Sequence, residues 1–181
     1  MVYIFLGEGF EEMEAIIPGD VLRRARISTA YVGLAGRTVT GAHGIAVQAD
    51  ITLAELQVCD AEMIVLPGGR KGVESILGCA AALQAVVDAW KDGKLIAALC
   101  AAPTILARLH ITDGKSVTCY PDACWTSQMG GSRYEPWAFV RDGNVITGAS
   151  AGCTLPFALE LVRALRGPEM AAQVEQGLVI R

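Results

Sequence analysis

Short apolar runs recur along the chain, and most alternate with segments in which apolar residues return every three or four positions. Such runs are typical of buried strands, and such segments are typical of helices that cover a sheet. The runs that predict strands are residues 2–7, 28–35, 62–69, 94–100 and 144–150. The segments that predict helices are residues 11–25, 81–93, 102–110 and 154–165, with Gly93 as a stop and Thr154 as a cap.

This alternation predicts a mainly parallel sheet with helices on both faces. A shorter pair of runs, 37–41 and 44–50, predicts an antiparallel hairpin outside the main sheet. No repeat, linker or low-complexity tract divides the chain. We therefore expect one domain over residues 1–181 with a three-layer α/β/α sandwich fold.

The composition narrows the classes of function. With 52% hydrophobic and 19% charged residues the chain is globular, and a net charge of -4 without a basic cluster argues against nucleic-acid binding. The start lacks the features of a signal peptide, and Pro103 interrupts an apolar run around Cys100 that is too short for a membrane span. The six cysteines form no CxxC pairs. We expect a soluble, cytoplasmic protein with reduced thiols.

Four loops follow predicted strands, at the sheet edge where open α/β sheets bind ligands. They read GEGFEE, PGGRKG, CAAP and SAGCT. Together these loops bring a thiol, carboxylates and backbone N–H groups to one edge. This inventory is typical of an active site.

Cys100 stands at the junction between a predicted strand and a predicted helix. Free N–H groups and the positive end of a helix dipole lower the pKa of a thiol, so this position favours a partly ionised nucleophile. Cysteine is also a common buried residue, and the position alone leaves open that Cys100 only fills space. The small residues Ala101 and Ala102 leave room for a substrate.

Glu14 is the candidate acidic partner. It is the charged member of an otherwise apolar helical face made by Phe10, Ile17, Pro18, Val21 and Ala25. Burial there would raise its pKa, so that Glu14 could donate a hydrogen bond to a thiolate or shuttle a proton. Glu11 lies at the edge of the same face and remains an alternative. As acids of a first turn, Glu11 and Glu12 are otherwise explained by the helix dipole.

The two histidines offer no clear base for a cysteine nucleophile. His110 lies ten residues after Cys100, about 15 Å along a helix axis. His43 falls in the turn of the predicted hairpin, where it is either a solvated turn residue or a group that reaches a site across a dimer interface. A Cys-His-Asp triad is not visible.

The remaining candidates for the site are backbone N–H groups and possible metal ligands. Gly68 and Gly69 follow a strand and supply N–H groups that can face an anion or an oxyanion. Cys119 and Cys124, with Asp122 between them, have no histidine or second cysteine pair nearby. We expect no metal site.

Several segments in this order resemble the ThiJ/PfpI family, in the branch of the parkinsonism-associated protein deglycase. They are EEMEAIIPGDVLRRA, VGLAG, IVLPGG, AALCAAPTILA, FALELVRAL and AAQVEQGLV. The resemblance implies a flavodoxin-like sandwich in which Cys100 occupies a nucleophile elbow, a tight turn between strand and helix. It also implies that Glu14 is the acidic partner and that Gly68, Gly69 and Ala101 lie on the oxyanion side.

The chain departs from family patterns at three places. Tyr120 precedes Pro121 where some members of this branch have a histidine, which argues against a histidine-assisted mechanism. The family's Gly-Pro-Gly-Thr segment is replaced by residues 150–153, Ser-Ala-Gly-Cys. Leu99 and Ala101 match neither protease-like relatives nor class I glutamine amidotransferases, so those activities are disfavoured.

The resemblance implies a glutathione-independent glyoxalase or protein deglycase that acts on methylglyoxal, glyoxal and their early adducts, without a cofactor or metal. One alternative is a redox sensor or stress chaperone whose Cys100 is oxidised to a sulfinate. Another is a thiazole-biosynthesis type relative with a phosphorylated or unknown substrate. The resemblance also implies a homodimer in which Arg24 and His43 approach the partner's site.

Overall fold

The centre of the molecule is a seven-stranded sheet. The computed structural model describes residues 1–180, and in these residues only β10 runs antiparallel to its neighbour. The mainly parallel sheet predicted from the sequence is confirmed. In spatial order the strands are β10 (Phe139–Asp142), β11 (Val145–Gly148), β7 (Leu95–Leu99), β6 (Met63–Leu66), β1 (Val2–Leu6), β2 (Thr29–Gly33) and β5 (Ile51–Thr52).

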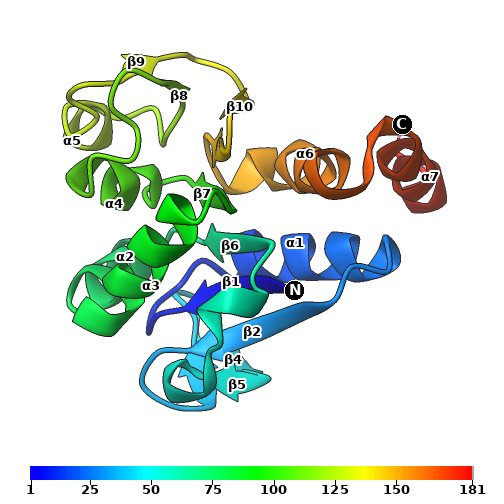
Figure 1. The fold of residues 1–181 in the computed structure, drawn as a ribbon, viewed down its shortest axis with the longest axis horizontal. Coiled ribbons are helices and arrows are strands. Elements are labelled where there is room, and N and C mark those ends of the chain that lie inside the picture. The colour runs from blue at the N-terminus through cyan, green and yellow to red at the C-terminus, as the bar shows by residue number, and fades with distance from the viewer. Residues whose placement is uncertain (181) are drawn as a thin grey trace.

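Helices cover both faces of this sheet (Figure 1). On one side lie α1 (Glu12–Arg24), α6 (Thr154–Arg166) and α7 (Pro168–Leu178), and on the other lie α2 (Arg70–Leu77), α3 (Ala80–Lys91) and α4 (Pro103–Arg108). The three-layer sandwich is therefore confirmed. No single described helix is long and apolar enough to span a membrane, although α2 and α3, which meet at 84°, pass on length and composition as a bent pair.

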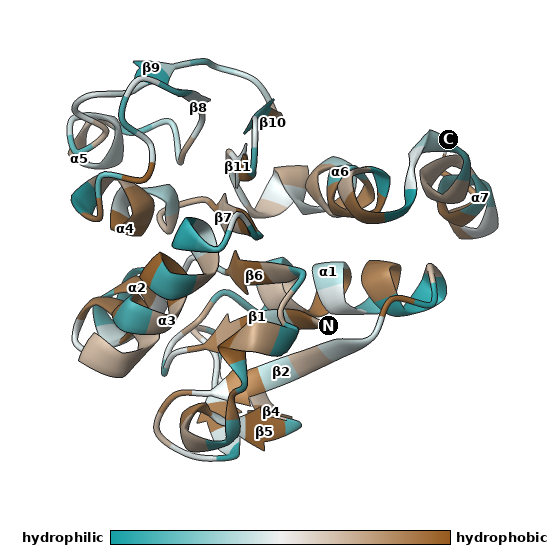
Figure 2. Ribbon diagram, in the orientation of Figure 1, coloured by the Kyte–Doolittle hydropathy of each residue, from teal (hydrophilic) through white to brown (hydrophobic). Residues whose placement is uncertain are grey.

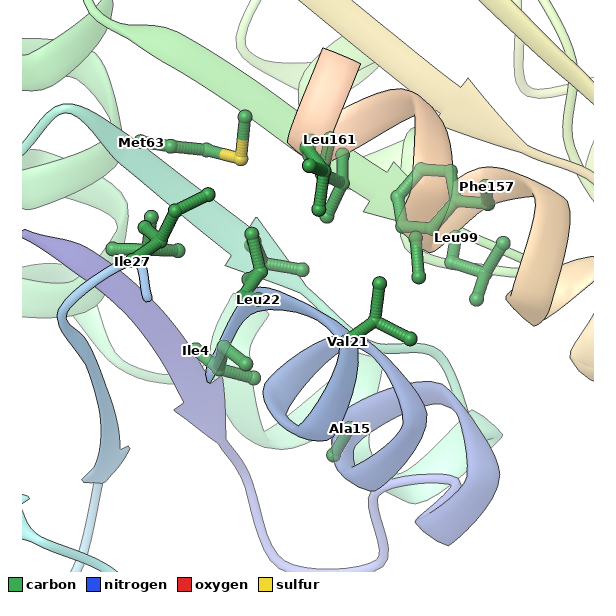
Figure 3. Packing of buried hydrophobic residues seen from close by; sticks show 14 of the residues in the cluster. Ile4, Ala15, Val21, Leu22, Ile27, Met63, Leu99, Phe157 and Leu161 are labelled. Atoms are coloured by element: carbon green, nitrogen blue, oxygen red, sulfur yellow. The ribbon is translucent and has the colours of Figure 1, made fainter. Parts of the chain in front are cut away.

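Each face of the sheet has its own hydrophobic core. The central strands are strongly apolar (Figure 2), because a strand between two helical layers is buried on both sides. On the α1 side, Val21 and Leu22 pack with Phe157 and Leu161 of α6 (Figure 3). All four of these side chains are at most 1% exposed, so the apolar stripe of α1 is held firmly in place.

The smaller elements show where periodicity fails as a signal. The predicted hairpin forms as β3 (Thr38–Thr40) and β4 (Ala46–Gln48). Helices α2 and α7 and strands β5 and β10 were not predicted, nor were the shorter elements that follow. These are β8 (Ser116–Val117), α5 (Ala123–Thr126), β9 (Arg133–Tyr134) and the 3-10 turns Leu53–Glu55, Val58–Asp60 and Ala151–Cys153.

Several predicted boundaries differ from the structure by up to three residues, and two predictions at helix ends need correction. Helix α4 ends at Arg108, two residues before the predicted end at His110. Thr154 is the first residue of α6 rather than its cap, and its hydroxyl donates back to the carbonyl of Ala151 at 2.7 Å. Gly93 does follow α3, with φ at 73°.

The register of the sheet brings the carboxyl ends of its central strands together. Leu66 pairs with Ala98, and Gly148 pairs with Leu99, so β6, β7 and β11 end at one edge. The segments after these strands, with the segment between β1 and α1, build the candidate site.

Candidate active site

Cys100 sits on a strained turn. Strand β7 ends at Leu99, residues 100–102 form the turn, and α4 begins at Pro103. Cys100 has a φ of 62°, a left-handed conformation that is unfavourable for a residue with a side chain. Its N–H donates to the carbonyl of Gly148 at 2.9 Å, and its carbonyl accepts from the N–H of Tyr120 at 2.8 Å. These bonds hold the thiol in the tight turn that the resemblance implied.

Glu14 is buried beside this thiol. Its side chain is 0% exposed, which confirms that the apolar face of α1 is buried. Its Oε2 accepts the N–H of Gly68 at 2.7 Å, whereas its Oε1 has no hydrogen-bond partner. A buried carboxylate oxygen without a partner is costly, and protonation of Glu14 relieves that cost.

Only glycine fits at position 68. A Cβ there would lie 2.6 Å from Oε2 of Glu14 and 2.9 Å from Cβ of Cys100. A side chain at position 68 would therefore crowd both the acid and the thiol.

Replacing Gly68 with alanine is expected to displace Glu14 and to lower the free energy of unfolding by about 1–3 kcal/mol, the usual cost of overpacking. The control is Gly36→Ala, because a Cβ at Gly36 meets nothing within 4 Å. Urea denaturation measures stability, and iodoacetamide labelling across pH 6–9 measures the surroundings of Cys100. If Gly68→Ala matched Gly36→Ala in both measurements, the close packing around Gly68 would be refuted.

The Glu14 carboxylate disfavours ionisation of the Cys100 thiol, whereas the thiol, through a hydrogen bond, favours the ionised form of Glu14. Burial raises the pKa of Glu14 to about 7, against the opposing effects of the Gly68 N–H and the Cys100 thiol. Burial and the neighbouring Glu14 carboxylate also raise the pKa of the Cys100 thiol, and the N–H of Ala101 opposes them. The lowered thiol pKa predicted from the sequence is therefore wrong. Cys100 precedes α4 by three residues, and burial outweighs the helix terminus.

Glu14 and Cys100 consequently titrate as a pair. A carboxylate and a thiolate together would place two negative charges in a buried site. Above a pH of about 7, the pKa of Glu14, the pair carries a single negative charge. The thiolate forms when the remaining proton lies on Glu14.

Two backbone N–H groups near the thiol are free. Within residues 1–180, no oxygen accepts a hydrogen bond from the N–H of Gly69 or Ala101. The N–H of Ala101 favours the thiolate of Cys100. The N–H of Gly68 is donated to Glu14, so Gly68 positions the acid and is not free to bind an oxyanion.

The four loops predicted to converge meet around one cavity of about 240 Å³. The volume suits a small molecule. Its lining residues come from all four loops, from α1, from the segment between β8 and α5, and from α5 itself. They are Glu11, Glu14, Gly69, Arg70, Cys100, Ala101, Tyr120, Trp125 and Ala151.

Two other predicted candidates lie outside this cavity. Arg24 forms an ion pair with Asp20 at 2.6 Å, beside a separate depression near α7. His43 lies in the β3–β4 turn and bonds Glu12 through Nδ1 at 2.9 Å. Tyr120, in contrast, lines the cavity.

Glu12 does more than favour the helix dipole. It is 7% exposed, and it accepts the N–H of His43 at 2.7 Å as well as the imidazole contact. Burial opposes these hydrogen bonds, but together they lower its pKa. Glu11, Glu12 and His43 place three atoms that could bind a metal within 4.8 Å of one another. Glu12 already accepts hydrogen bonds from His43 of the hairpin. Glu12 therefore holds the hairpin against α1.

Arg70 and Trp125 were missed by sequence reasoning. Arg70 begins α2 directly after Gly69, and its guanidinium carbon lies 5.2 Å from the ring centroid of Trp125. The position of Arg70 at a strand end was a usable signal. Trp125 lies in a four-residue helix without any periodic pattern, so it could not be placed from the sequence.

Known proteins share this fold and much of this sequence. The family model for the DJ-1/PfpI family matches residues 1–164. The chain is 35% identical to Drosophila melanogaster Protein dj-1beta over 178 residues, which cover 98% of this chain and 95% of that protein. The crystal structure of Drosophila DJ-1beta superposes with a TM-score of 0.93 and covers 99% of this chain and 97% of its own.

Two further matches carry informative names. The Caenorhabditis elegans glutathione-independent glyoxalase DJR-1.2 is 33% identical over 162 residues, which cover 90% of this chain and 86% of that protein. The structure of oxidized Toxoplasma gondii DJ-1 has a TM-score of 0.90 at 27% identity and covers 98% of this chain and 97% of its own. On the family model and on relatives matched along nearly their whole length, the chain belongs to the DJ-1/PfpI family.

Proposed function

We propose that the protein is a glutathione-independent glyoxalase or deglycase that acts on methylglyoxal, glyoxal and their early adducts through Cys100. The observation that carries the proposal is the buried Glu14 and Cys100 pair, which shares one proton beside free N–H groups. The named activity of DJR-1.2 supports it. No group from outside the chain is required for this chemistry.

In the first step, the Cys100 thiolate attacks the aldehyde carbon of methylglyoxal. A C–S bond forms, and the carbonyl electron pair moves to oxygen, where the N–H groups of Gly69 and Ala101 stabilise it. Protonated Glu14 then gives its proton to this oxygen, which yields a hemithioacetal. In an early adduct, the same attack displaces the bound amine or thiol, which leaves with the proton of Glu14.

In the second step, ionised Glu14 removes the hydrogen from the former aldehyde carbon and returns a proton to the neighbouring carbon. Together with passage of the hydroxyl proton from the first oxygen to the second, this internal transfer converts the hemithioacetal into a lactyl thioester of Cys100. Water cleaves the thioester, releases lactate and returns the thiol. The net reaction adds one water to methylglyoxal, and transfer of the thiol proton of Cys100 to the ionised Glu14 restores the starting pair.

The test is lactate formation from methylglyoxal without glutathione. We expect wild-type protein to produce lactate and Cys100→Ala to lose at least 10³-fold in rate, because no other group replaces the nucleophile. Cys119→Ala is the matched control, since Cys119 is a buried thiol outside the cavity. Turnover that survived in Cys100→Ala would contradict the proposal.

A second candidate function is redox sensing. The neighbour structure described as oxidized supports it, and so does the setting of Cys100 between an acid and free N–H groups. Two molecules of peroxide would each transfer one oxygen to the thiolate and leave as water, giving a sulfinate. Peroxide-dependent gain of two oxygens at Cys100, without lactate formation by fresh protein, would favour the sensor over the enzyme.

We also propose that the protein forms a homodimer through the outer face of α1. Met13 and Ile16 expose 48% and 39% of their surface on that helix, and Ile45 of the hairpin turn exposes 58%. The N–H of Ile45 contacts Glu12 at 3.4 Å, so the hairpin continues the same surface. Exposed apolar side chains gathered in this way are typical of an interface.

Light scattering at micromolar concentration is expected to give twice the chain mass of 19.1 kDa. Ile16→Glu should shift the protein toward monomer, because it buries a charge in the interface. Tyr134→Glu is the control, since Tyr134 is comparably exposed, at 37%, on β9. A wild-type monomer at this concentration would contradict the proposal.

A further inference from the structure

Arg70 is an unpaired cation at the wall of the Cys100 cavity. Among the residues that the structure describes, Arg70 forms no ion pair, whereas Arg23, Arg37 and Arg163 each bind a carboxylate. Its guanidinium is placed over Trp125, with 5.2 Å between the guanidinium carbon and the ring centroid. Stacking orients the planar group, which also contacts the thiol of Cys124, and the remaining N–H donors are available at its edge.

The nearest acids do not neutralise this cation. Asp122 is occupied as the cap of α5, where its Oδ1 accepts the N–H of Cys124 at 2.8 Å. The bonds with Cys124 lower the pKa of Asp122 more than the charge of Arg70 does. Glu11 lines the cavity too, but it forms no ion pair with Arg70.

An anionic substrate can bind in this cavity only if a cation offsets the negative charge of the Glu14 and Cys100 pair. The Glu14 and Cys100 pair carries one negative charge above a pH of about 7, so an anion entering alone would be repelled. A guanidinium binds a carboxylate through two parallel N–H···O bonds, which gives both attraction and orientation.

We infer that Arg70 forms a carboxylate subsite, so that the preferred substrates are 2-oxoaldehydes with a carboxylate at the end remote from the aldehyde. The inference rests on the proposed function. The Cys100 thiolate attacks the aldehyde while Arg70 holds the distal carboxylate. For 4,5-dioxopentanoate, addition of one water gives 2-hydroxyglutarate by the two steps described for methylglyoxal.

The kinetic test compares kcat/KM for 4,5-dioxopentanoate with kcat/KM for methylglyoxal. In wild type, the ratio should favour the anionic substrate. Arg70→Gln should lower the ratio about tenfold or more, mainly through KM, because a charge-assisted bond to the bound substrate is lost. Lys71→Gln is the matched control, since it removes the same charge one residue away and Lys71 does not line this cavity. An unchanged ratio in Arg70→Gln, or an equal fall in Lys71→Gln, would overturn the subsite.

A second readout does not depend on turnover. Iodoacetate and iodoacetamide alkylate Cys100 by the same displacement of iodide, but only iodoacetate carries a carboxylate. Mass spectrometry of the tryptic peptide covering residues 95–108 separates Cys100 from Cys124, whose thiol also lies near Arg70. The iodoacetate-to-iodoacetamide rate ratio should fall about tenfold in Arg70→Gln and stay at the wild-type value in Lys71→Gln.

Lactate formation and the alkylation ratio together distinguish failure of the carboxylate subsite from failure of the proposed glyoxalase activity. An Arg70-dependent alkylation ratio in a protein that forms no lactate would keep the subsite and reject the glyoxalase. Lactate formation with an alkylation ratio independent of Arg70 would keep the enzyme and reject the subsite.

Discussion

Replacing Glu14 with glutamine is expected to lower the rate of lactate formation from methylglyoxal by about 10²–10⁴-fold, the usual loss when a general acid–base group is removed. Glutamine preserves the size of the side chain and can accept the N–H of Gly68, so the packing of α1 should survive. It cannot exchange a proton with the substrate. Because Glu14 moves a proton between two carbons, we expect the loss in kcat rather than in KM.

Two further variants make this result specific. Glu11→Gln changes the other carboxylate that lines the cavity and should keep most of the turnover. Glu14→Asp keeps the acid but withdraws it by one methylene, so it should fall between wild type and Glu14→Gln. Full activity in Glu14→Gln, or complete loss in Glu11→Gln alone, would mean that the wrong acid has been assigned.

The position of Glu14 could be predicted because it depends on helical geometry. Phe10, Pro18 and Val21 lie on the same side as Glu14, and a helix must bury that side against its sheet. Five strands of the main sheet, β1, β2, β6, β7 and β11, were equally predictable, since each is an apolar run of four or five residues. Both inferences use only neighbours in sequence.

What could not be predicted depends on contacts between distant segments. The helix-junction argument gave the thiol of Cys100 a lowered pKa, because the strand and the helix are adjacent in sequence. The opposing effects come from burial and from Glu14, which lies 86 residues earlier and reaches the thiol only through the fold. Local sequence carries no sign of this competition.

The failure to predict that Arg70 and Trp125 line the cavity has a similar cause. Arg70 begins an amphipathic helix whose first residues have the composition of a glycine-rich loop, and Trp125 belongs to a helix of four residues. The eight residues of α2 make little more than two turns, and the four residues of α5 make about one, so the helical period is too short to stand out. Their meeting over Cys100 results from the packing of α2, α4 and α5, which no single segment encodes.

Glu14 should also make the stability of the protein depend on pH. Burial raises its pKa from 4.5 to about 7 in the folded state. Below pH 4.5 the group is protonated in both the folded and the unfolded state, and no penalty arises. As the pH rises through about 7, the unfolded state gains from ionisation that the folded state resists, so stability falls by roughly 3 kcal/mol on the scale of 1.36 kcal/mol per pKa unit.

We therefore expect Glu14→Gln to gain stability relative to wild type between pH 4.5 and pH 8 by about this amount, measured by urea denaturation in reducing buffer. Glu12→Gln provides a control of opposite sign. Hydrogen bonds from His43 and the hairpin outweigh burial and lower the pKa of Glu12, so its contribution is present at neutral pH and is lost as the pH falls. Glu12→Gln should therefore lose stability relative to wild type as the pH rises. A pH-independent difference between wild type and Glu14→Gln would show that the buried acid ionises without penalty, and the shared-proton pair with Cys100 would then have no basis.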